Sequence, residues 1–588
     1  MDKATLKKVA GKLAPGGLGV FALAAFAFTD WPSLGFGVAV LAVGYLWWNN
    51  RSDGLARSLP DRALIITALM VWAMKSENGS GELLNLACGA LLLLVTLYEP
   101  LLRQSLNVGR LESRNLKVQR SKREKLFAPR WPYLAHLGLL VLYGLSVGLG
   151  WPAWPVLAGL GVVAVVNFSA VLSAWRERRA STHGHNGDQA VWNALEKHAP
   201  KFMVHYSAPP GTEYHVGMWL PYLEALKVPY MVVLRENRAL AAMARLTEAP
   251  VVVTPSMGQL EQVIVPSLKI SFYVNNGMKN VQSIRFSQLT HIQLLHGDSD
   301  KASSYNPVTA MFDKIYVAGQ AGIDRYKDNN VLVPEEKFTI VGRPQVSEVE
   351  IVNTPIADVA SPTVFYAPTW SGWFTDTNYC SLSIAEKILG GLIERGATIV
   401  FRPHPYTSRN PASARQMQRV EQLLADDAAK SGRKHKWGKT TTKDMSLFEC
   451  MNECDAMVSD VTAVASDWLY SEKPFAITDM LDEGERFHKS FPLSQAAYVV
   501  RSDASNVGEV LDNLLKRDPL ADRRRDMKTY YLGDFPGSYV EGFLGAVRED
   551  LRGKPGFEED RPSAEVPKQH HAAAVLRDQD DRDDDGDE

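Results

Sequence analysis

Cysteine is scarce in this chain, which has four among 588 residues. Cys450 and Cys454 are four positions apart, but no second pair or histidine cluster accompanies them to complete a metal site. Cys380 stands alone in the same half of the chain, and Cys88 lies in an apolar stretch. The sequence therefore predicts reduced thiols in a cytoplasmic domain, with neither a metal nor another cofactor.

Ionisable side chains are also scarce inside the apolar stretches that follow one another in the first 175 residues. These stretches cover residues 16–29, 33–48, 63–74, 83–102, 133–150 and 152–175. The last three are long enough to cross a bilayer, whereas the first three are short against the roughly 20 residues that a spanning helix needs. His136 is the main ionisable residue inside them, which argues against a proton-coupled transporter.

Positive charges between the stretches indicate how the chain crosses the membrane. They precede the first stretch and follow the second, fourth and sixth, while the other loops contain only Lys75. The loop after the fourth stretch is the most basic, with Arg103, Arg110, Arg114, Lys117, Arg120, Lys122, Arg123, Lys125 and Arg130. Six spans with both ends cytoplasmic satisfy the positive-inside rule at every loop. We therefore predict a multi-pass domain of the cell membrane over residues 1–180, without a cleaved signal peptide. The basic loop is also a candidate site for anionic lipid, but topology explains it more economically.

The end of the chain lacks apolar residues. It reads "RDQDDRDDDGDE" and is strongly acidic. Such a segment buries too little apolar surface to offset the entropy that ordering would cost. We predict a disordered acidic tail over residues 556–588, and a solubility role explains it better than a binding role.

Between these regions, short β-branched runs alternate with amphipathic helical stretches. One set runs from "KFMVHYSA" at residue 201 to "KIYVAG" at residue 314, and a second from "PTVFYAPTW" at residue 362 to "KPFAIT" at residue 473. This alternation predicts parallel sheets covered by helices. We expect two Rossmann-like domains, over residues 190–345 and 346–552, that face each other across a cleft.

Polar residues follow three of the predicted strands, at the positions where open parallel sheets bind ligands. His296-Gly297-Asp298 follows "IQLL", Arg402-Pro403-His404 follows "TIVF", and Ser459-Asp460-Val461-Thr462 follows "DAMV". Asp460 or Thr462 can cap the helix that comes next, whose first turn then suits a diphosphate. Arg402 adds a bidentate phosphate donor. Each feature alone has a purely structural explanation, but two histidines on loops of opposite domains are harder to explain that way.

These residues resemble a known family. "LLHGDSDK", "VFYAPTWSG", "FRPHP" and "SDVTAVASDWLYSEKPFAI", in that order, are similar to the CDP-glycerol glycerophosphotransferases that make teichoic-acid-type polymers. The resemblance is strongest over residues 290–480. It implies a GT-B fold, CDP-glycerol as donor, and transfer of glycerol phosphate to a hydroxyl of a lipid-linked envelope acceptor with release of CMP.

The resemblance also implies roles for individual residues. His296 corresponds to the general base, Arg402 and His404 to contacts with the donor phosphates, and the loop from Ser459 through Asp460 to Thr462 covers the diphosphate. We count both histidines as catalytic candidates. The chain departs from the family at Asp298-Ser299, where Thr-Pro is usual, and at Ala463, where a second hydroxyl is usual. Asp298, Ser299 and Lys301 are the candidates on the acceptor side.

We therefore predict an α-helical membrane domain followed by an α/β GT-B enzyme, a glycerophosphotransferase. Its partners are CDP-glycerol, a polyprenyl diphosphate-linked glycan or polymer, and the membrane, without nucleic acid. Three alternatives stay open: a transferase using CDP-ribitol, a GT-B glycosyltransferase using a nucleotide sugar, and a non-catalytic membrane scaffold. The sequence does not distinguish addition of one unit from polymerisation.

Overall fold

The computed structural model describes ten stretches of the chain. They are residues 17–28, 32–49, 59–75, 80–107, 111–118, 131–181, 188–209, 211–352, 354–372 and 378–552. The lysines before the first apolar stretch, most of the basic loop and the acidic tail lie outside these residues. Within them the chain divides into two compact units, residues 1–110 with 118–190, and residues 111–117 with 191–588.

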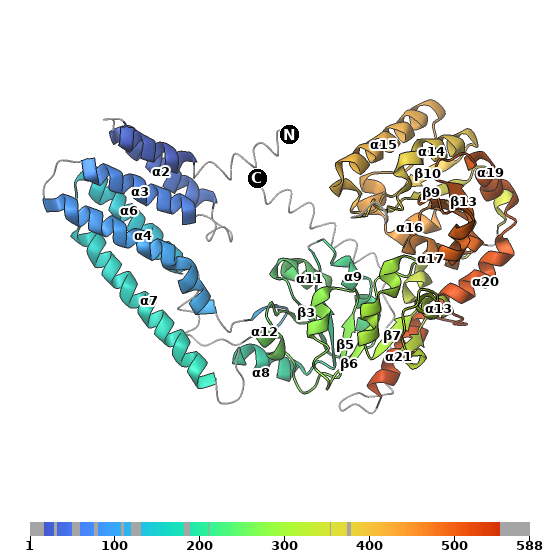
Figure 1. The fold of residues 1–588 in the computed structure, drawn as a ribbon, viewed down its shortest axis with the longest axis horizontal. Helices are drawn as coiled ribbons and strands as arrows, with labels where there is room; N and C mark the ends of the chain where they lie inside the picture. The colour runs from blue at the N-terminus through green and yellow to red at the C-terminus, as the bar shows by residue number, and fades with distance from the viewer. Residues whose placement is uncertain are drawn as a thin grey trace. The chain divides into compact units, whose positions relative to one another are not determined.

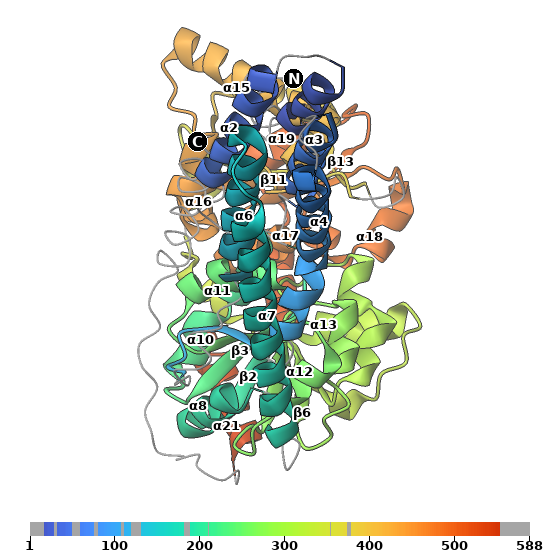
Figure 2. The same ribbon diagram turned by 90° about the vertical axis from the view of Figure 1, so that its left-hand side faces the viewer.

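The first unit is helical, and each of the six apolar stretches falls in a helix. The helices span Gly17–Phe28, α2 Pro32–Asn49, α3 Leu59–Lys75, α4 Ser80–Asn107, α6 Trp131–Leu149 and α7 Trp154–Ser181. Helices α3, α4, α6 and α7 pack alongside one another (Figures 1 and 2). Ala68, Leu92, Leu140 and Val156 are among the apolar side chains buried between them.

Two of these helices are long and apolar enough to cross a membrane. The qualifying windows are Leu83–Leu102 in α4 and Trp154–Ser173 in α7, while Gly17–Phe28 and Ala135–Leu149 are shorter apolar helices. Only 28% of each window is buried within the protein. Most residues of the two windows are therefore not fully buried, unlike those of a helix at the centre of a soluble core.

A buried ionic cluster joins three helices of this unit. Arg62 of α3 donates from Nη1 to Oε2 of Glu99 in α4 at 2.7 Å. Nδ1 of His136, from α6, lies 3.3 Å from the same carboxylate oxygen. All three side chains are at most 2% exposed. The start of α3, the last part of α4 and the start of α6 therefore lie at one end of the helical unit.

The second unit begins with an eight-stranded sheet. Its strands are β1 Glu112–Arg114, β2 Phe202–Tyr206, β3 Tyr230–Leu234, β4 Val251–Val253, β5 Ile270–Tyr273, β6 Thr290–Gln293, β7 Lys314–Val317 and β8 Phe338–Ile340. They lie in the order β1-β4-β3-β2-β5-β6-β7-β8, and only β1 is antiparallel to its neighbour. Strands β2 to β5 are buried on both faces, which explains their continuous apolar runs.

A second sheet, wholly parallel, follows in the same unit. Its strands are β9 Thr363–Ala367, β10 Thr398–Phe401, β11 Ala456–Ser459, β12 Phe475–Asp479 and β13 Tyr498–Arg501, in the order β10-β9-β11-β12-β13. Two parallel sheets in one chain are the arrangement expected of a GT-B-like α/β fold.

Helices connect the strands of both sheets. Those of the first α/β domain are α8 Gln189–His198, α9 Tyr214–Gly217, α10 Leu220–Ala225, α11 Leu240–Leu246, α12 Met257–Glu261 and α13 Gln320–Asp328. Those after it are α14 Ala385–Glu394, α15 Pro411–Ser431, α16 Leu447–Asn452, α17 Ala463–Trp468, α18 Phe487–Ser490, α19 Val507–Asp512, α20 Ala521–Leu532 and α21 Tyr539–Leu551. The longest, α15, begins where the Asn410 side chain accepts from two backbone N–H groups and ends at Gly432, whose φ is 74°.

The structure adds two features that the sequence pattern did not predict. Strand β1 comes from the basic loop after the fourth apolar stretch and pairs with β4, and the Asn115 side chain donates to the carbonyls of Ala244 and Thr247. At the other end of the chain, Phe543 and Val547 of α21 are buried in the core of the first sheet, beside β6 and β7 in Figure 1. The range predicted for the second α/β domain, residues 346–552, therefore includes a helix that packs against the first sheet.

Candidate functional site

The loops that hold the predicted site residues meet where the two α/β domains contact each other. A Cβ atom added to Gly297 would lie 2.9 Å from Cβ of Ala463, so the loop after β6 closely approaches the start of α17. Lys301 donates from Nζ to Oγ1 of Thr369, which follows β9, at 3.1 Å. His404 N donates to Pro368 O in that same loop. His296, His404 and residues 460–463 therefore lie on loops that come together at this junction.

His296 is held in a defined orientation at the end of β6. Leu295 before it has a φ of 56°, an unusual value for a leucine, and its carbonyl accepts from Nε1 of Trp219 at 2.7 Å. Nδ1 of His296 lies 2.9 Å from the carbonyl oxygen of Val274. Because a carbonyl only accepts, Nδ1 carries the hydrogen and Nε2 keeps a free lone pair. The left-handed φ in this loop is that of Leu295 and not of Gly297. Glycine at position 297 instead allows the backbone to lie close to Ala463.

Burial lowers the pKa of His296 below its usual range, and nearby Arg343 acts in the same direction. The imidazole is therefore neutral at pH 7. A neutral ring with an open Nε2 is the form that accepts a proton from a hydroxyl group.

His404 has the opposite arrangement of nitrogens. The backbone N–H of Tyr406 donates to Nδ1 of His404 at 3.1 Å, so in the neutral ring Nε2 carries the hydrogen. Burial, followed by the charge of Lys301, lowers the pKa of His404 to about 4. At neutral pH this side chain is therefore an uncharged N–H donor, suited to a phosphate oxygen.

Arg402 is partly engaged within its own domain. Its Nη1 donates to the carbonyl oxygens of Thr441 and Met445, the latter at 2.8 Å. These contacts fix the guanidinium beside the turn over residues 440–445. The bidentate phosphate contact expected from the sequence is not tested by this arrangement and stays a prediction.

Ser459 and Asp460 hold the strand ends together. Ser459 Oγ donates to Ala367 O at 2.7 Å. The Asp460 carboxylate accepts from Thr369 N at 2.7 Å, Ser381 N at 3.2 Å and Thr478 Oγ1 at 2.7 Å. Thr462 is the N-cap of α17 without a side-chain capping bond, and that helix has six residues. The contacts that the structure shows for Ser459 and Asp460 are therefore with the protein itself.

The three acceptor-side candidates have different surroundings in the structure. Asp298 pairs with Arg325, and Ser299 is buried with its Oγ 3.3 Å from Oγ of Ser304. Lys301 instead reaches the second domain, with its Nζ 5.3 Å from the ring centre of Tyr379. Burial lowers the pKa of Lys301 to about 8. Lys301 is thus the candidate that the structure places next to His404.

One residue of the site was absent from the sequence prediction. His215, in α9, stacks on His296 with ring centres 3.6 Å apart and planes 9° from parallel. It follows β2, while Val274 follows β5 and His296 follows β6, and these three strands are neighbours. Its place after a strand of the first set was the signal available, but no motif marked it.

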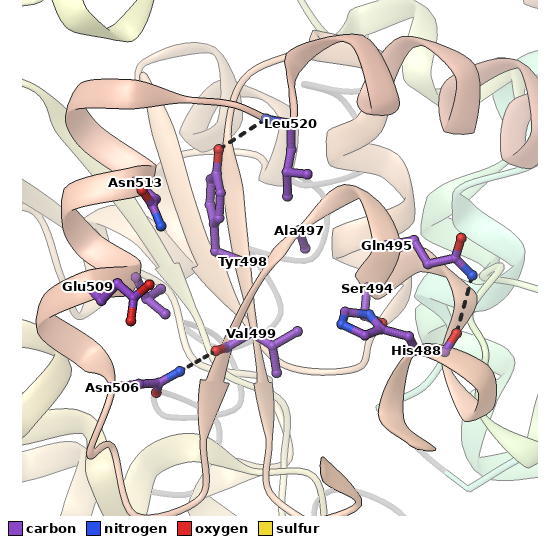
Figure 3. A pocket seen from close by; sticks show the side chains of 11 residues that line it. His488, Ser494, Gln495, Ala497, Tyr498, Val499, Asn506, Glu509, Asn513 and Leu520 are labelled. Carbon is purple, nitrogen blue, oxygen red and sulfur yellow. Dashed lines mark hydrogen bonds between the residues drawn. The ribbon is translucent and has the colours of Figure 1, made fainter. Parts of the chain in front are cut away.

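A separate pocket lies elsewhere. It has a volume of about 570 Å³ and is lined by His488, Tyr498, Glu509 and Asn513, among others (Figure 3). These side chains surround β13, an edge strand of the second sheet, and Asn506 donates to Val499 O there at 2.9 Å. None of the predicted site residues lines it, so we assign it no part in the chemistry. Within the described residues, no group of three or more His, Cys, Asp or Glu side chains is placed to hold a metal ion.

Two parallel α/β sheets, with imidazoles from both domains at their junction, form a GT-B-like α/β fold. Residues 350–483 match the family described as CDP-Glycerol:Poly(glycerophosphate) glycerophosphotransferase. The chain is a CDP-glycerol glycerophosphotransferase-like transferase, and the resemblance predicted from its motifs is confirmed. The match includes Arg402, His404 and residues 459–462, and it leaves out His296.

No curated protein matches the chain. Several solved structures are similar to it at low identity. The S. aureus MnaA–UDP complex is 14% identical and covers 60% of this chain and 96% of its own, with a TM-score of 0.41. The wall teichoic acid polymerase TagF soaked with CDPG is 12% identical over 62% of this chain and 92% of its own, with a TM-score of 0.39. A glycosyltransferase from Rickettsia africae is 11% identical over 60% and 99%, also with a TM-score of 0.39.

Proposed function

We propose that this protein is a membrane-integrated glycerophosphotransferase that moves glycerol phosphate from CDP-glycerol to a hydroxyl group of a lipid-linked envelope acceptor. The family match over residues 350–483 carries the proposal. The acceptor oxygen attacks the phosphorus that bears glycerol, the bond from that phosphorus to the bridging oxygen breaks, and CMP leaves. Nε2 of His296 takes the hydroxyl proton as the new bond forms.

Charged and N–H donors around this base fit a diphosphate. We propose that His404 donates from Nε2 to a phosphate oxygen and that Lys301 and Arg402 supply positive charge. Asp460 keeps the ends of β9, β11 and β12 in register and orders the loop through Thr462 over the donor. This pattern supports transfer of a phosphorylated group and disfavours a scaffold without activity.

A donor panel tests the proposal. Purified full-length protein, in vesicles that contain a polyprenyl diphosphate-linked glycan, is incubated with CDP-glycerol, CDP-ribitol or UDP-sugars. We expect CMP release from CDP-glycerol that increases with the acceptor. Release of CMP from CDP-ribitol alone would show that CDP-ribitol is the donor. Release of UMP or UDP would indicate a glycosyltransferase. The absence of any nucleotide product from folded protein would favour the scaffold.

We further propose a multi-pass topology with the transferase in the cytoplasm. Most exposed large apolar side chains of the described residues lie in the helical unit, as expected for a lipid-facing surface. The cluster of Arg62, Glu99 and His136 supports antiparallel α3 and α4, because it joins the start of one helix to the last part of the other. Since a strand cannot pair with a sheet across a bilayer, β1 supports one common side for the basic loop and the first α/β domain.

Cysteine labelling in intact cells tests this topology. The four native cysteines are all buried, so single cysteines can be introduced into the otherwise unchanged chain. We expect Lys117→Cys to react with an impermeant maleimide only after permeabilisation. Trp151→Cys, in the turn between α6 and α7, is the matched control and should react in intact cells. Efficient labelling of Lys117→Cys in intact cells would overturn the proposed topology.

The pKa of Lys301 predicts a dependence of substrate affinity on pH. Because its pKa is about 8, the ammonium is present below pH 8 and is lost above it. We expect KM for CDP-glycerol to rise above pH 8 in the parent protein. Lys301→Arg, which stays charged, should remove this rise, and Lys301→Met should raise KM roughly tenfold below pH 8 and remove the dependence on pH. If KM depends on pH in Lys301→Met as it does in the parent protein, Lys301 does not contact the donor.

A further inference from the structure

The stack of His215 on His296 is enclosed by aromatic rings. The edge of Tyr214 meets His215 with ring centres 4.4 Å apart and planes at 83°, and Tyr206 lies 6.4 Å away at 89°. His215 is thereby held on α9 and β2, while His296 is held separately by its bond to Val274. The two side chains are fixed by different elements and stack face to face, so the His296 ring packs against the flat face of His215.

One ring nitrogen of His215 makes no hydrogen bond in this contact. Nδ1 is buried and has no hydrogen-bond partner in the described part of the chain. A buried nitrogen without a partner costs stability, so hydrogen bonding by Nδ1 does not explain the presence of the ring. The flat face does, because it contacts the residue that we assign as the base.

We propose that His215 is a positioning residue for transfer, whose ring face fixes the plane of His296 so that Nε2 points toward the acceptor hydroxyl. This inference rests on the proposed function of His296. The His215 ring also covers one face of His296 at 3.6 Å and keeps water from it, which favours the uncharged form of His296. The titratable groups that face the pair are Tyr206, Tyr214 and His404, and Arg343 lies near His296. Burial and the two neighbouring histidines lower the pKa of His215 itself to about 2.

Two substitutions distinguish the effect of a planar ring at position 215 from the effect of filling the space. His215→Phe keeps an aromatic plane, whereas His215→Leu fills the space without one. We expect His215→Phe to retain kcat within about threefold of the parent value. His215→Leu should lose roughly 10–100-fold in kcat, with KM for CDP-glycerol within about twofold, because misplacement of a reacting group slows chemistry more than binding.

Equal kcat in the two variants would overturn the proposal, since volume alone would then suffice. A large loss in His215→Phe would overturn it as well, because an imidazole nitrogen would then be required. A structural role would lower the folded fraction without this split between kcat and KM.

A second measurement does not depend on turnover. Diethyl pyrocarbonate modifies neutral imidazole, so the rate of His296 modification against pH, followed by peptide mass spectrometry, reports the protonation of that ring. In the parent protein we expect the rate to fall below pH 6.5, and in His215→Ala to fall at a higher pH than in the parent, because water then reaches the uncovered face of His296. Identical profiles would overturn the inference, even if the donor panel yields no product and the proposed function fails.

Discussion

Replacing His296 with Asn is expected to slow CMP release by roughly 10²–10⁴-fold, the usual contribution of a positioned general base. The Asn amide can still donate to Val274 O, as Nδ1 of His296 does, but it has no atom at the place of Nε2. CDP-glycerol affinity should stay near the parental value, because the phosphate contacts are assigned to Arg402, His404 and Lys301. Calorimetric titration of donor binding and a CMP release assay measure the two quantities separately.

His198→Asn is the matched control for this substitution. His198 also bonds to a carbonyl, that of Tyr230, but through Nε2, at 3.0 Å, so Asn loses this bond. The residue lies at the end of α8 rather than at the junction. We expect parental turnover in this variant. Substantial turnover in folded His296→Asn would show that His296 only stabilises its own loop.

Replacing Arg343 with Ala should cause the largest loss of stability, about 3–5 kcal/mol in the free energy of unfolding. Arg343 follows β8, and its Nε and Nη2 donate to the two carboxylate oxygens of Asp467 in α17, the Nη2 contact at 3.0 Å. The two side chains are 5% and 3% exposed. The substitution leaves a buried carboxylate without its partner, in a contact that joins the two α/β domains. Differential scanning calorimetry of the full chain should show a lower unfolding midpoint.

A more exposed pair in the same unit serves as the control. Arg395 and Asp512 are 19% and 30% exposed, so Arg395→Ala should cost less stability than Arg343→Ala. The double variant Arg343→Met/Asp467→Leu should recover much of the lost stability, because apolar residues of similar size can replace a buried ion pair. Equal losses in Arg343→Ala and Arg395→Ala would mean that the buried pair contributes no more than a surface pair.

Local sequence patterns were sufficient to predict most of the α/β fold. Apolar β-branched runs such as "YMVVL" and "TIVF" form strands because both faces of a parallel sheet are covered. β1, with the sequence "ESR", lacks such a run, and β13, with the sequence "YVVR", has only a short one that ends at Arg501. They are edge strands that form through pairing with a neighbour, and periodicity does not reveal that pairing. The packing of α21 against the first sheet is likewise a long-range contact.

The candidate site was predicted in part for a related reason. Residues that follow strands, such as His296 and His404, are visible from local sequence. The stacking of His215, the pairing of Asp298 with Arg325 and the enclosure of Asp460 by backbone N–H groups depend on which strands become neighbours. The same holds for Arg62 and Glu99, whose charges lie near the ends of apolar segments and pair only when the helices pack.

The pairing of β1 with β4 has a consequence for biogenesis. The strand formed by residues 112–114 is synthesised before helices α6 and α7, whereas its partner at residues 251–253 is synthesised after them. The first sheet therefore cannot be completed until both helices have left the ribosome. A chain shortened to begin at residue 188 would lack β1 and leave the backbone of β4 unpaired along one edge, a surface prone to self-association. Complete maturation of the first α/β domain thus depends on a segment that is made with the helical unit.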